Sequence, residues 1–138
     1  MKVTVKHIKG MHFQSEGNSK VITNIDTSVT AGGTGHGNSP MELVLMAIAG
    51  CSGMDIIAIL EKMQVKVQNF ETTVEGERAG DHPRVFKDIE VIYKFWGETL
   101  PEDKIRRAVQ LSMEKYCSVA NMLDKVANLS YSIEYNPE

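Results

Sequence analysis

Polar and apolar residues alternate in three short runs near the amino end of the chain. These runs are Val3 to Val5, His12 to Ser15 and Val21 to Ile25, with turn sequences at Lys9-Gly10 and Glu16-Gly17 between them. A period of two residues is typical of a strand that buries one face, and glycine favours the turns between strands. The pattern therefore predicts a meander of three strands.

A glycine-rich segment, Ala31 to Asn38, separates the meander from a long apolar stretch. It predicts a loop, and it has neither the Lys-Ser/Thr pair nor the strand context of a phosphate-binding loop. Ser39-Pro40-Met41-Glu42 then has the composition of a helix start, because serine can cap, proline suits the first helical position and Glu42 completes a capping box. We expect one helix from there to about Met63.

The predicted helix is apolar on almost every side, so other structure must wrap around it. A three-stranded sheet is too small to cover that surface, and a second subunit is a natural source of the rest. The length of the apolar stretch approaches that of a membrane span. However, Asp55 lies near its middle, and Glu42 and Glu61 bracket it, which favours a long buried central helix and no membrane partner.

The remainder of the chain predicts two strands, two helices and a last strand. The expected ranges are 65–77 and 85–96 for a hairpin, 101–117 and 118–127 for the helices, and 129–135 for the closing strand. Within the hairpin, Ile89, Val91, Tyr93 and Phe95 recur at every second position, as in a half-buried strand. The order βββαββααβ indicates an α+β fold with an antiparallel sheet, in a single domain over residues 1–138.

Composition narrows the choice of partners. The chain has 138 residues, of which 42% are hydrophobic and 24% charged, and its net charge is -3. These values are ordinary for a globular protein, and the slight negative charge gives no basic surface for nucleic acid. The amino terminus lacks the continuous apolar core of a secretory signal, so we expect a cytoplasmic protein.

Two cysteines, Cys51 and Cys117, are the candidate reactive residues. They form neither a CxxC pair nor a zinc knuckle, and a cytosolic protein keeps its thiols reduced. Cys51 lies on the apolar helix, where a cysteine commonly packs as a small hydrophobe. Cys117 lies at a helix junction, where backbone amides of the next helix could stabilise a thiolate. The residues alone leave open whether either thiol reacts.

The histidines give no sign of a metal centre. His7, His12, His36 and His82 are scattered over predicted strands and loops, with no pair at helical ligand spacing. Methionine and aromatic side chains more often fill a core than form a ligand site. We therefore expect no metal and no cofactor.

Three segments resemble the OsmC/Ohr family of organic hydroperoxide reductases. They are Ser39 to Leu43, Ala49-Gly50-Cys51 and Tyr116 to Asn121, and the order of predicted elements agrees with that family. The resemblance implies an interlaced homodimer with two active sites at the subunit interface. It also implies that Cys51 attacks an organic hydroperoxide, that Cys117 resolves the resulting sulfenic acid as a disulfide, and that an external dithiol restores both thiols.

Two positions depart from the family pattern. Members with peroxidase activity carry an acid directly after the helix-starting proline, where this chain has Met41, with Glu42 one place later. The family also uses an arginine from the amino-terminal strands, whereas the first arginine here is Arg78. Glu42 and Arg84 are therefore the candidate accessory residues, although a capping box would explain Glu42 and a solvated strand end would explain Arg84.

Two other functions stay open at this point. An OsmC-like dimer with little peroxidase activity could bind a small apolar or thiol-reactive ligand in the same cleft, which the missing arginine and the shifted acid favour. A structural or interaction module with two inert thiols is the third hypothesis. The peroxidase predicts a reducible disulfide, whereas inert thiols would resist alkylation in the native state.

Overall fold

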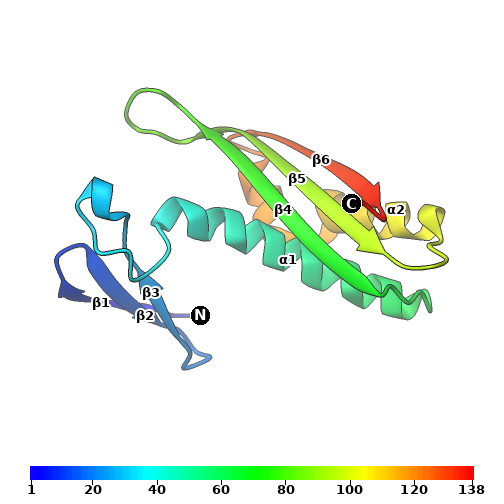
Figure 1. Ribbon diagram of the computed structural model, residues 1–138, viewed down its shortest axis with the longest axis horizontal. Coiled ribbons are helices and arrows are strands. Elements are labelled where there is room, and N and C mark those ends of the chain that lie inside the picture. The colour runs from blue at the N-terminus through cyan, green and yellow to red at the C-terminus, as the bar shows by residue number, and fades with distance from the viewer. The chain divides into compact units, whose positions relative to one another are not determined.

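The computed structural model describes residues 1–138 and divides the chain into two compact units, Met1–Val44 and Leu45–Glu138. Each unit contains one three-stranded sheet. Strands and helices follow one another in the predicted order, with a short 3-10 segment and a π-helical turn in addition (Figure 1). The prediction of a mixed α+β fold is therefore confirmed.

The first unit contains the predicted meander. Strands β1 (Thr4–Lys9), β2 (His12–Glu16) and β3 (Ile22–Ile25) pair antiparallel with β2 in the centre. Gly10, in the turn after β1, has a φ of 55°, a left-handed conformation that glycine adopts without steric cost. The alternating pattern thus predicts the strands, and the short turns between them allow only antiparallel pairing.

The glycine-rich loop is organised around one buried carboxylate. Asp26 accepts hydrogen bonds from the backbone N–H groups of Thr27, Thr34 and His36 and from the Thr34 hydroxyl. These bonds, above all that from the Thr34 hydroxyl, hold the pKa of Asp26 far below its ordinary value. A Cβ at Gly33 would collide with the Thr27 carbonyl oxygen, so only glycine fits there. The loop, with the 3-10 segment Val29–Ala31, is therefore a defined structure.

Helix α1 (Pro40–Lys62) begins at the predicted capping box and ends one residue before the predicted boundary. In the single chain it is buried along one stripe only, at spacings of four residues: Ile48, Ser52, Ile56 and Leu60. Apolar side chains outside this stripe, such as Met46 and Met54, are exposed. As expected, the three-stranded sheet covers only one side of the helix, and cover of the other sides by a second subunit stays a prediction.

The second sheet contains one parallel pair. Strands β4 (Asn69–Arg78) and β5 (Phe86–Trp96) form the predicted antiparallel hairpin, but β6 (Asn128–Tyr135) runs parallel to β5. The purely antiparallel sheet is therefore wrong. Helices α2 (Glu102–Leu111) and α3 (Ser118–Leu123), joined by the π-helical turn Ser112–Tyr116, carry the chain back to the end where β5 starts. Such a helical crossover produces a parallel neighbour.

The core of the second unit lies between its sheet and its helices. The central strand β5 alternates, and Ile89, Val91, Tyr93 and Phe95 are almost completely buried. Helices α1 and α2 lie on one face of this sheet (Figure 1), and α2 buries Ile105, Ala108 and Val109. The two helices are thereby held side by side, which fixes the residues that face each other between them.

Helix α1 is also the one helix of the chain long and apolar enough to cross a membrane, judged by length and composition. Core helices of soluble proteins pass the same test, so the finding is weak support for a span. About a fifth of its apolar window, 22%, is buried within the single chain.

Candidate active site

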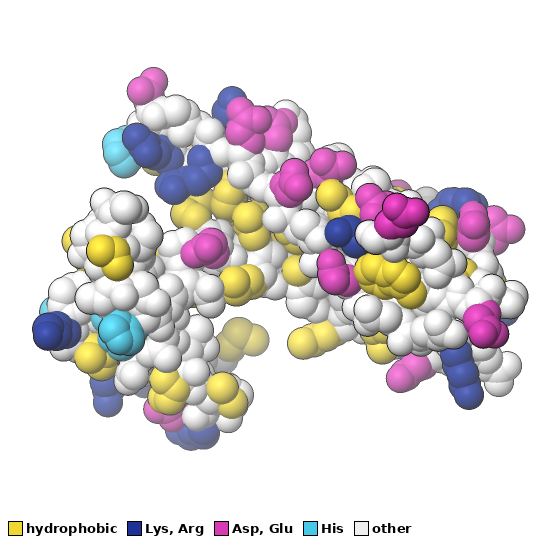
Figure 2. Space-filling model, viewed as in Figure 1, with side chains coloured by type: hydrophobic (Ala, Val, Ile, Leu, Met, Phe, Trp, Pro, Cys, Tyr) yellow, Lys and Arg dark blue, Asp and Glu magenta, His cyan; other side chains and the backbone are white.

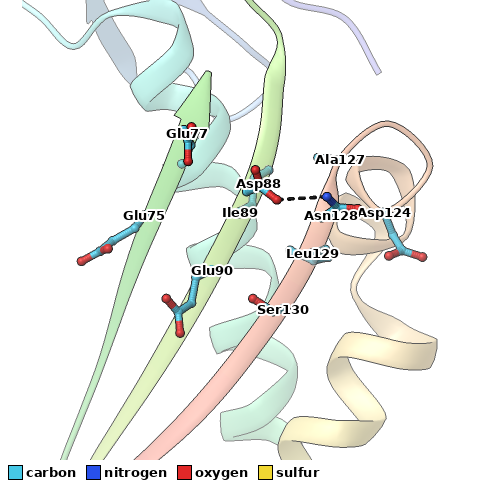
Figure 3. A pocket seen from close by; sticks show the side chains of 11 residues that line it. Glu75, Glu77, Asp88, Ile89, Glu90, Asp124, Ala127, Asn128, Leu129 and Ser130 are labelled. Carbon is cyan, nitrogen blue, oxygen red and sulfur yellow. Dashed lines mark hydrogen bonds between the residues drawn. The ribbon is translucent and has the colours of Figure 1, made fainter. Parts of the chain in front are cut away.

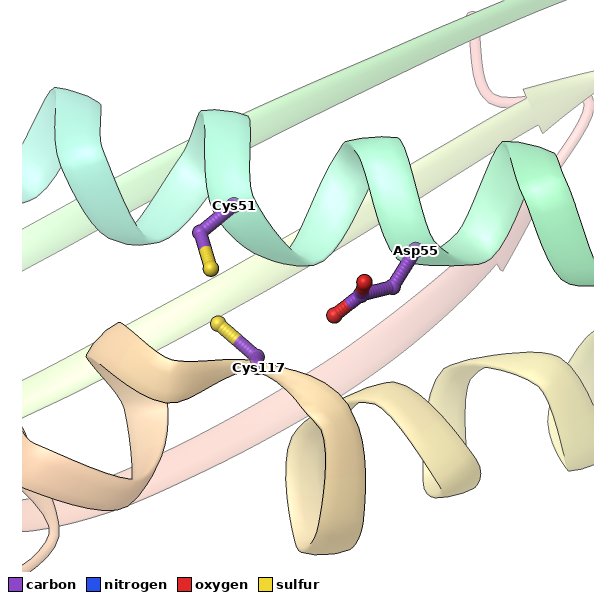
Figure 4. A group of neighbouring side chains, drawn as sticks. All are labelled: Cys51, Asp55 and Cys117. Atoms are coloured by element: carbon purple, nitrogen blue, oxygen red, sulfur yellow. The ribbon is translucent and has the colours of Figure 1, made fainter.

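The fold brings the two cysteines together. Cys51 lies in the middle of α1, and Cys117 lies in the turn between α2 and α3. Figure 4 shows the two side chains pointing toward each other across the gap between these elements, and their sulfurs lie within 4.8 Å. Both thiols are free, and no disulfide joins them. Rotation of the two side chains is the movement that a bond between them would require.

Cys117 is held in place by the end of one helix and the start of the next. Its backbone N–H donates to the Ser112 carbonyl at 2.8 Å, which closes the π-helical turn. Its Sγ accepts a hydrogen bond from the Ala120 N–H at 3.3 Å, so the thiol acts as the cap of α3. The side chain is 0% exposed, and this burial raises the pKa of Cys117 to about 11. At neutral pH the residue is a protonated, sheltered thiol.

Cys51 is more accessible than Cys117. Its residue is half-buried, whereas Cys117 is fully enclosed. The neighbouring positions Gly50 and Gly53 have no side chains, and with Met54 and Phe70 they line an open, mainly apolar groove of about 480 Å³ between α1 and β4. Cys51 itself does not line this groove, but it is the more exposed of the two thiols.

A carboxylate completes the cluster. Asp55 lies one helical turn after Cys51, so both side chains emerge on the same face of α1 (Figure 4). A carboxylate oxygen of Asp55 lies within 4.8 Å of both sulfurs. The hydroxyl of Ser112 is 3.3 Å from Asp55 Oδ2 and 3.2 Å from the Ser52 carbonyl oxygen, so it can donate to either acceptor. In the sequence, Asp55 serves only as evidence against a membrane span, although its spacing of four residues from Cys51 is the signal for a shared site.

The wall behind the cysteines is polar in two places and otherwise apolar. Ser52 is fully buried and donates to the Ile48 carbonyl oxygen at 2.7 Å. Tyr93 is also fully buried, and its hydroxyl contacts the Met113 sulfur at 3.0 Å. Burial raises the pKa of Tyr93 above its ordinary value. Both hydroxyl groups therefore donate to partners inside the core.

The two accessory candidates, Glu42 and Arg84, are not part of the cysteine cluster. Glu42 accepts hydrogen bonds from the Ser39 N–H and hydroxyl at 2.7 and 2.8 Å, while its own N–H donates to the Ser39 hydroxyl. This is the predicted capping box, and the bond from the Ser39 N–H is the main reason that the pKa of Glu42 is lowered. Arg84 is exposed near the tip of the β4–β5 hairpin, where basic side chains gather in Figure 2, and none of the ion pairs includes it.

A larger hollow lies elsewhere in the second unit. It has a volume of about 680 Å³ and is lined mainly by acidic and small polar residues of β4, β5 and β6, including Glu75, Glu90 and Ser130 (Figure 3). It contains no cysteine and no histidine. We therefore take the cysteine cluster as the candidate site, because it is the place where nucleophilic side chains converge.

The chain thus has an α+β fold with two free cysteines facing each other between its long helix and its crossover. Residues 33–132 match the OsmC family, described as OsmC-like protein, and the chain belongs to this family. It is 39% identical to Protein YhfA of Escherichia coli strain K12 over 135 residues, which cover 97% of each chain.

Solved structures agree with this assignment. The chain is similar to a hypothetical protein from Aquifex aeolicus, with 29% identity, a TM-score of 0.81, and coverage of 99% of this chain and 97% of the other. It also shares its fold with an organic hydroperoxide resistance protein, OsmC, from Legionella pneumophila, at 16% identity and a TM-score of 0.69, with 97% of both chains covered. The predicted family is therefore confirmed.

Proposed function

We propose that the protein reduces organic hydroperoxides with Cys51 as the attacking thiol and Cys117 as the resolving thiol. The observation that carries this proposal is the pair of sulfurs within 4.8 Å, one half-buried and one fully buried. An accessible thiol can meet a peroxide, and an enclosed thiol beside it meets only the oxidised product. The chain belongs to the OsmC family, and its fold is similar to that of an organic hydroperoxide resistance protein. Both observations support the same chemistry.

The reaction proceeds in three steps. The Cys51 thiolate attacks one peroxide oxygen, the O–O bond breaks, and the departing alkoxide takes up a proton and leaves as the alcohol. Sulfur has then lost two electrons and is a sulfenic acid. The Cys117 sulfur attacks the Cys51 sulfur, the S–O bond breaks, and hydroxide leaves with the Cys117 proton as water. An external dithiol is oxidised as it returns both thiols to the reduced state.

A groove on α1 favours an organic substrate. Cys51 does not line it, but the adjacent Gly50 does, and its other walls are mainly apolar and small residues, among them Ala49, Met54 and Phe70. An apolar groove gains free energy by excluding water when it binds a hydrocarbon group. Hydrogen peroxide has no such group. We therefore expect preference for bulky organic hydroperoxides over hydrogen peroxide.

The exposed side of α1 supports a homodimer in the cytoplasm. Met46, Met54 and Ile57 leave apolar surface open, and Figure 2 shows hydrophobic side chains at the surface over the middle of α1. A second copy of the chain would cover this surface. Met46→Glu should produce monomers in analytical ultracentrifugation, whereas Met122→Glu, another exposed methionine outside α1, should not change the sedimentation. An unchanged dimer in Met46→Glu would contradict this interface.

A second candidate function is binding of a small apolar or thiol-reactive ligand with little peroxidase activity. The observation that favours it is the Asp55 carboxylate within 4.8 Å of both sulfurs, because a negative charge opposes formation of a thiolate beside it. Arg84, the candidate cation, belongs to no ion pair and lies near the hairpin tip. Slow consumption of hydroperoxide with both thiols intact would favour this function.

Peroxide titration of the reduced protein tests the proposal. Cumene hydroperoxide and hydrogen peroxide are compared, with free thiols counted and the Cys51–Cys117 disulfide identified by mass spectrometry. We expect stoichiometric loss of both thiols with the organic peroxide, and faster loss than with hydrogen peroxide. The Cys51→Ser variant is the matched control and should consume none. Unchanged thiols at large peroxide excess would rule out the peroxidase.

A further inference from the structure

Three metal-binding side chains converge at the cysteine pair. The sulfurs of Cys51 and Cys117 and a carboxylate oxygen of Asp55 all lie within 4.8 Å of one another. Two of them come from consecutive turns of one face of α1, and the third comes from the turn before α3 (Figure 4). No metal motif is visible in the sequence, because the ligands are split between distant segments and one is an aspartate four residues from a cysteine.

We propose that the reduced protein binds one thiophilic divalent cation of the zinc class at Cys51, Asp55 and Cys117. Zinc bonds of about 2.3 Å to sulfur and 2.0–2.2 Å to oxygen place tetrahedral ligands roughly 3.6–3.8 Å apart. The three donors already lie within about an ångström of that spacing. Small side-chain rotations on two fixed elements are sufficient to close the site around an ion.

Two of the three ligands have outer partners that orient them. Ser112 is within hydrogen-bond distance of Asp55 Oδ2, at 3.3 Å, which leaves the other carboxylate oxygen without that bond. The Ala120 N–H donates to Cys117 Sγ at 3.3 Å. Such hydrogen bonds fix the direction of a ligand and are a usual feature of metal sites in proteins.

The cluster also has negative character without a basic residue to balance it. None of the ion pairs of the chain includes Asp55, and no Lys or Arg hydrogen-bonds to either cysteine. A divalent cation supplies the missing positive charge and stabilises all three donors together. The unbalanced negative charge and the two sulfur ligands therefore both favour a thiophilic divalent cation.

Three protein ligands leave the fourth tetrahedral position open. Closed structural zinc sites use four protein ligands, whereas sites with three retain a position for water or a small molecule. Here the open position would lie on the side of half-buried Cys51. Because the ion needs two reduced sulfurs, metal binding and the Cys51–Cys117 disulfide exclude each other. The site itself requires only the thiols and does not depend on the peroxidase reaction.

Cobalt titration of the reduced, full-length protein without oxygen tests this site. Co²⁺ bound by two thiolates gives a sulfur-to-cobalt charge-transfer band and intense tetrahedral bands in the visible. We expect these bands to saturate at one ion per chain and to disappear when Zn²⁺ displaces cobalt. Oxidation of the wild type to the disulfide with diamide should abolish binding, and this control avoids any folding defect of a buried Cys117 variant.

Variants locate the ligands. Cys51→Ser should lose the charge-transfer band or weaken it strongly, and Asp55→Asn should weaken zinc binding by at least the roughly 10- to 100-fold that loss of an outer partner costs. Ser112→Ala should cost about 10-fold. Glu61→Gln, an exposed acid on the same helix, is the matched control and should bind as the wild type does. Absence of the bands, wild-type affinity in Asp55→Asn, or equal loss in Glu61→Gln would overturn the proposal.

Discussion

Two carboxylates, Asp26 in the first unit and Asp55 in the second, differ in how many hydrogen bonds they receive. Asp26 in the first unit accepts bonds from three backbone N–H groups and one hydroxyl. Asp55 in the second unit has one donor within reach, the Ser112 hydroxyl. A carboxylate whose lone pairs are occupied can only hold structure, whereas one with free lone pairs can still bind a proton or a cation. The comparison separates a structural acid from an acid available for chemistry.

The largest expected effect is that of replacing Cys51, whose sulfur lies within 4.8 Å of the Asp55 carboxylate. Cys51→Ser should abolish consumption of organic hydroperoxide, because a hydroxyl cannot form the sulfenic acid. Thermal stability should hardly change, since the residue is only half-buried. Peroxide consumption and thermal unfolding of the same preparation measure both quantities. Retention of wild-type activity would show that the reaction takes place elsewhere.

Cys117→Ala should change the product at Cys51. Without the second thiol, the sulfenic acid of Cys51 cannot condense to a disulfide and should accumulate, as trapping with dimedone and mass spectrometry would show. The variant should also lose about 1 kcal/mol of stability, because it removes a fully buried sulfur. A disulfide-linked product in this variant would contradict the resolving role.

Unlike Cys51→Ser, Asp26→Asn should lower the stability of the fold and change the reaction of the thiols little. The pKa of Asp26 is depressed in the folded state, so its ionised form stabilises the fold at all pH values above the ordinary aspartate pKa of about 3.9. That contribution is lost as pH falls through the depressed folded pKa. The difference in unfolding free energy between wild type and variant should therefore be full at neutral pH and shrink below about pH 4.

Asp81→Asn is the control for this pH profile, because Asp81 is exposed in the β4–β5 hairpin. Its unfolding free energy should follow that of the wild type at each pH. A difference for Asp26→Asn that stays constant down to strongly acidic pH would mean that the hydrogen-bonded carboxylate is not the source of the stability.

Asp55→Asn should have the smallest effect. Removal of a negative charge within 4.8 Å of both sulfurs makes a thiolate easier to form, so alkylation of Cys51 by iodoacetamide at neutral pH should accelerate several-fold. Unfolding free energy should change little, since Asp55 is only half-buried. An unchanged rate of alkylation in Asp55→Asn would show that the carboxylate does not influence the thiols. It would contradict the distinction between Asp26 as a structural acid and Asp55 as an acid available for chemistry.

Much of the fold could be predicted because local patterns determine it. The capping box at Ser39 and Glu42 fixed the start of α1, and alternation over Ile89 to Phe95 identified the central strand. The direction of β6 could not be predicted in the same way. Its alternation is identical for parallel and antiparallel pairing, and the outcome depends on how the helical crossover returns the chain.

The site was predicted in part. Cys51 and Cys117 were chosen from their neighbouring residues, but their separation in space depends on the packing of α1 against the crossover, which no local pattern encodes. Asp55 was missed because a single acid in an apolar helix has several explanations. Arg84 was proposed as a cation from its place in the sequence, and the extended hairpin instead leaves it in solvent.

The parallel pairing of β6 has a consequence for biosynthesis. Cys51 belongs to a helix that forms from local interactions, whereas Cys117 lies in the crossover, which becomes fixed only when β6 adds to β5. On the ribosome, the β5–β6 pair must await the emergence of β6. A nascent chain therefore carries Cys51 before its partner thiol is in place, and the two-thiol centre exists only after β6 has emerged.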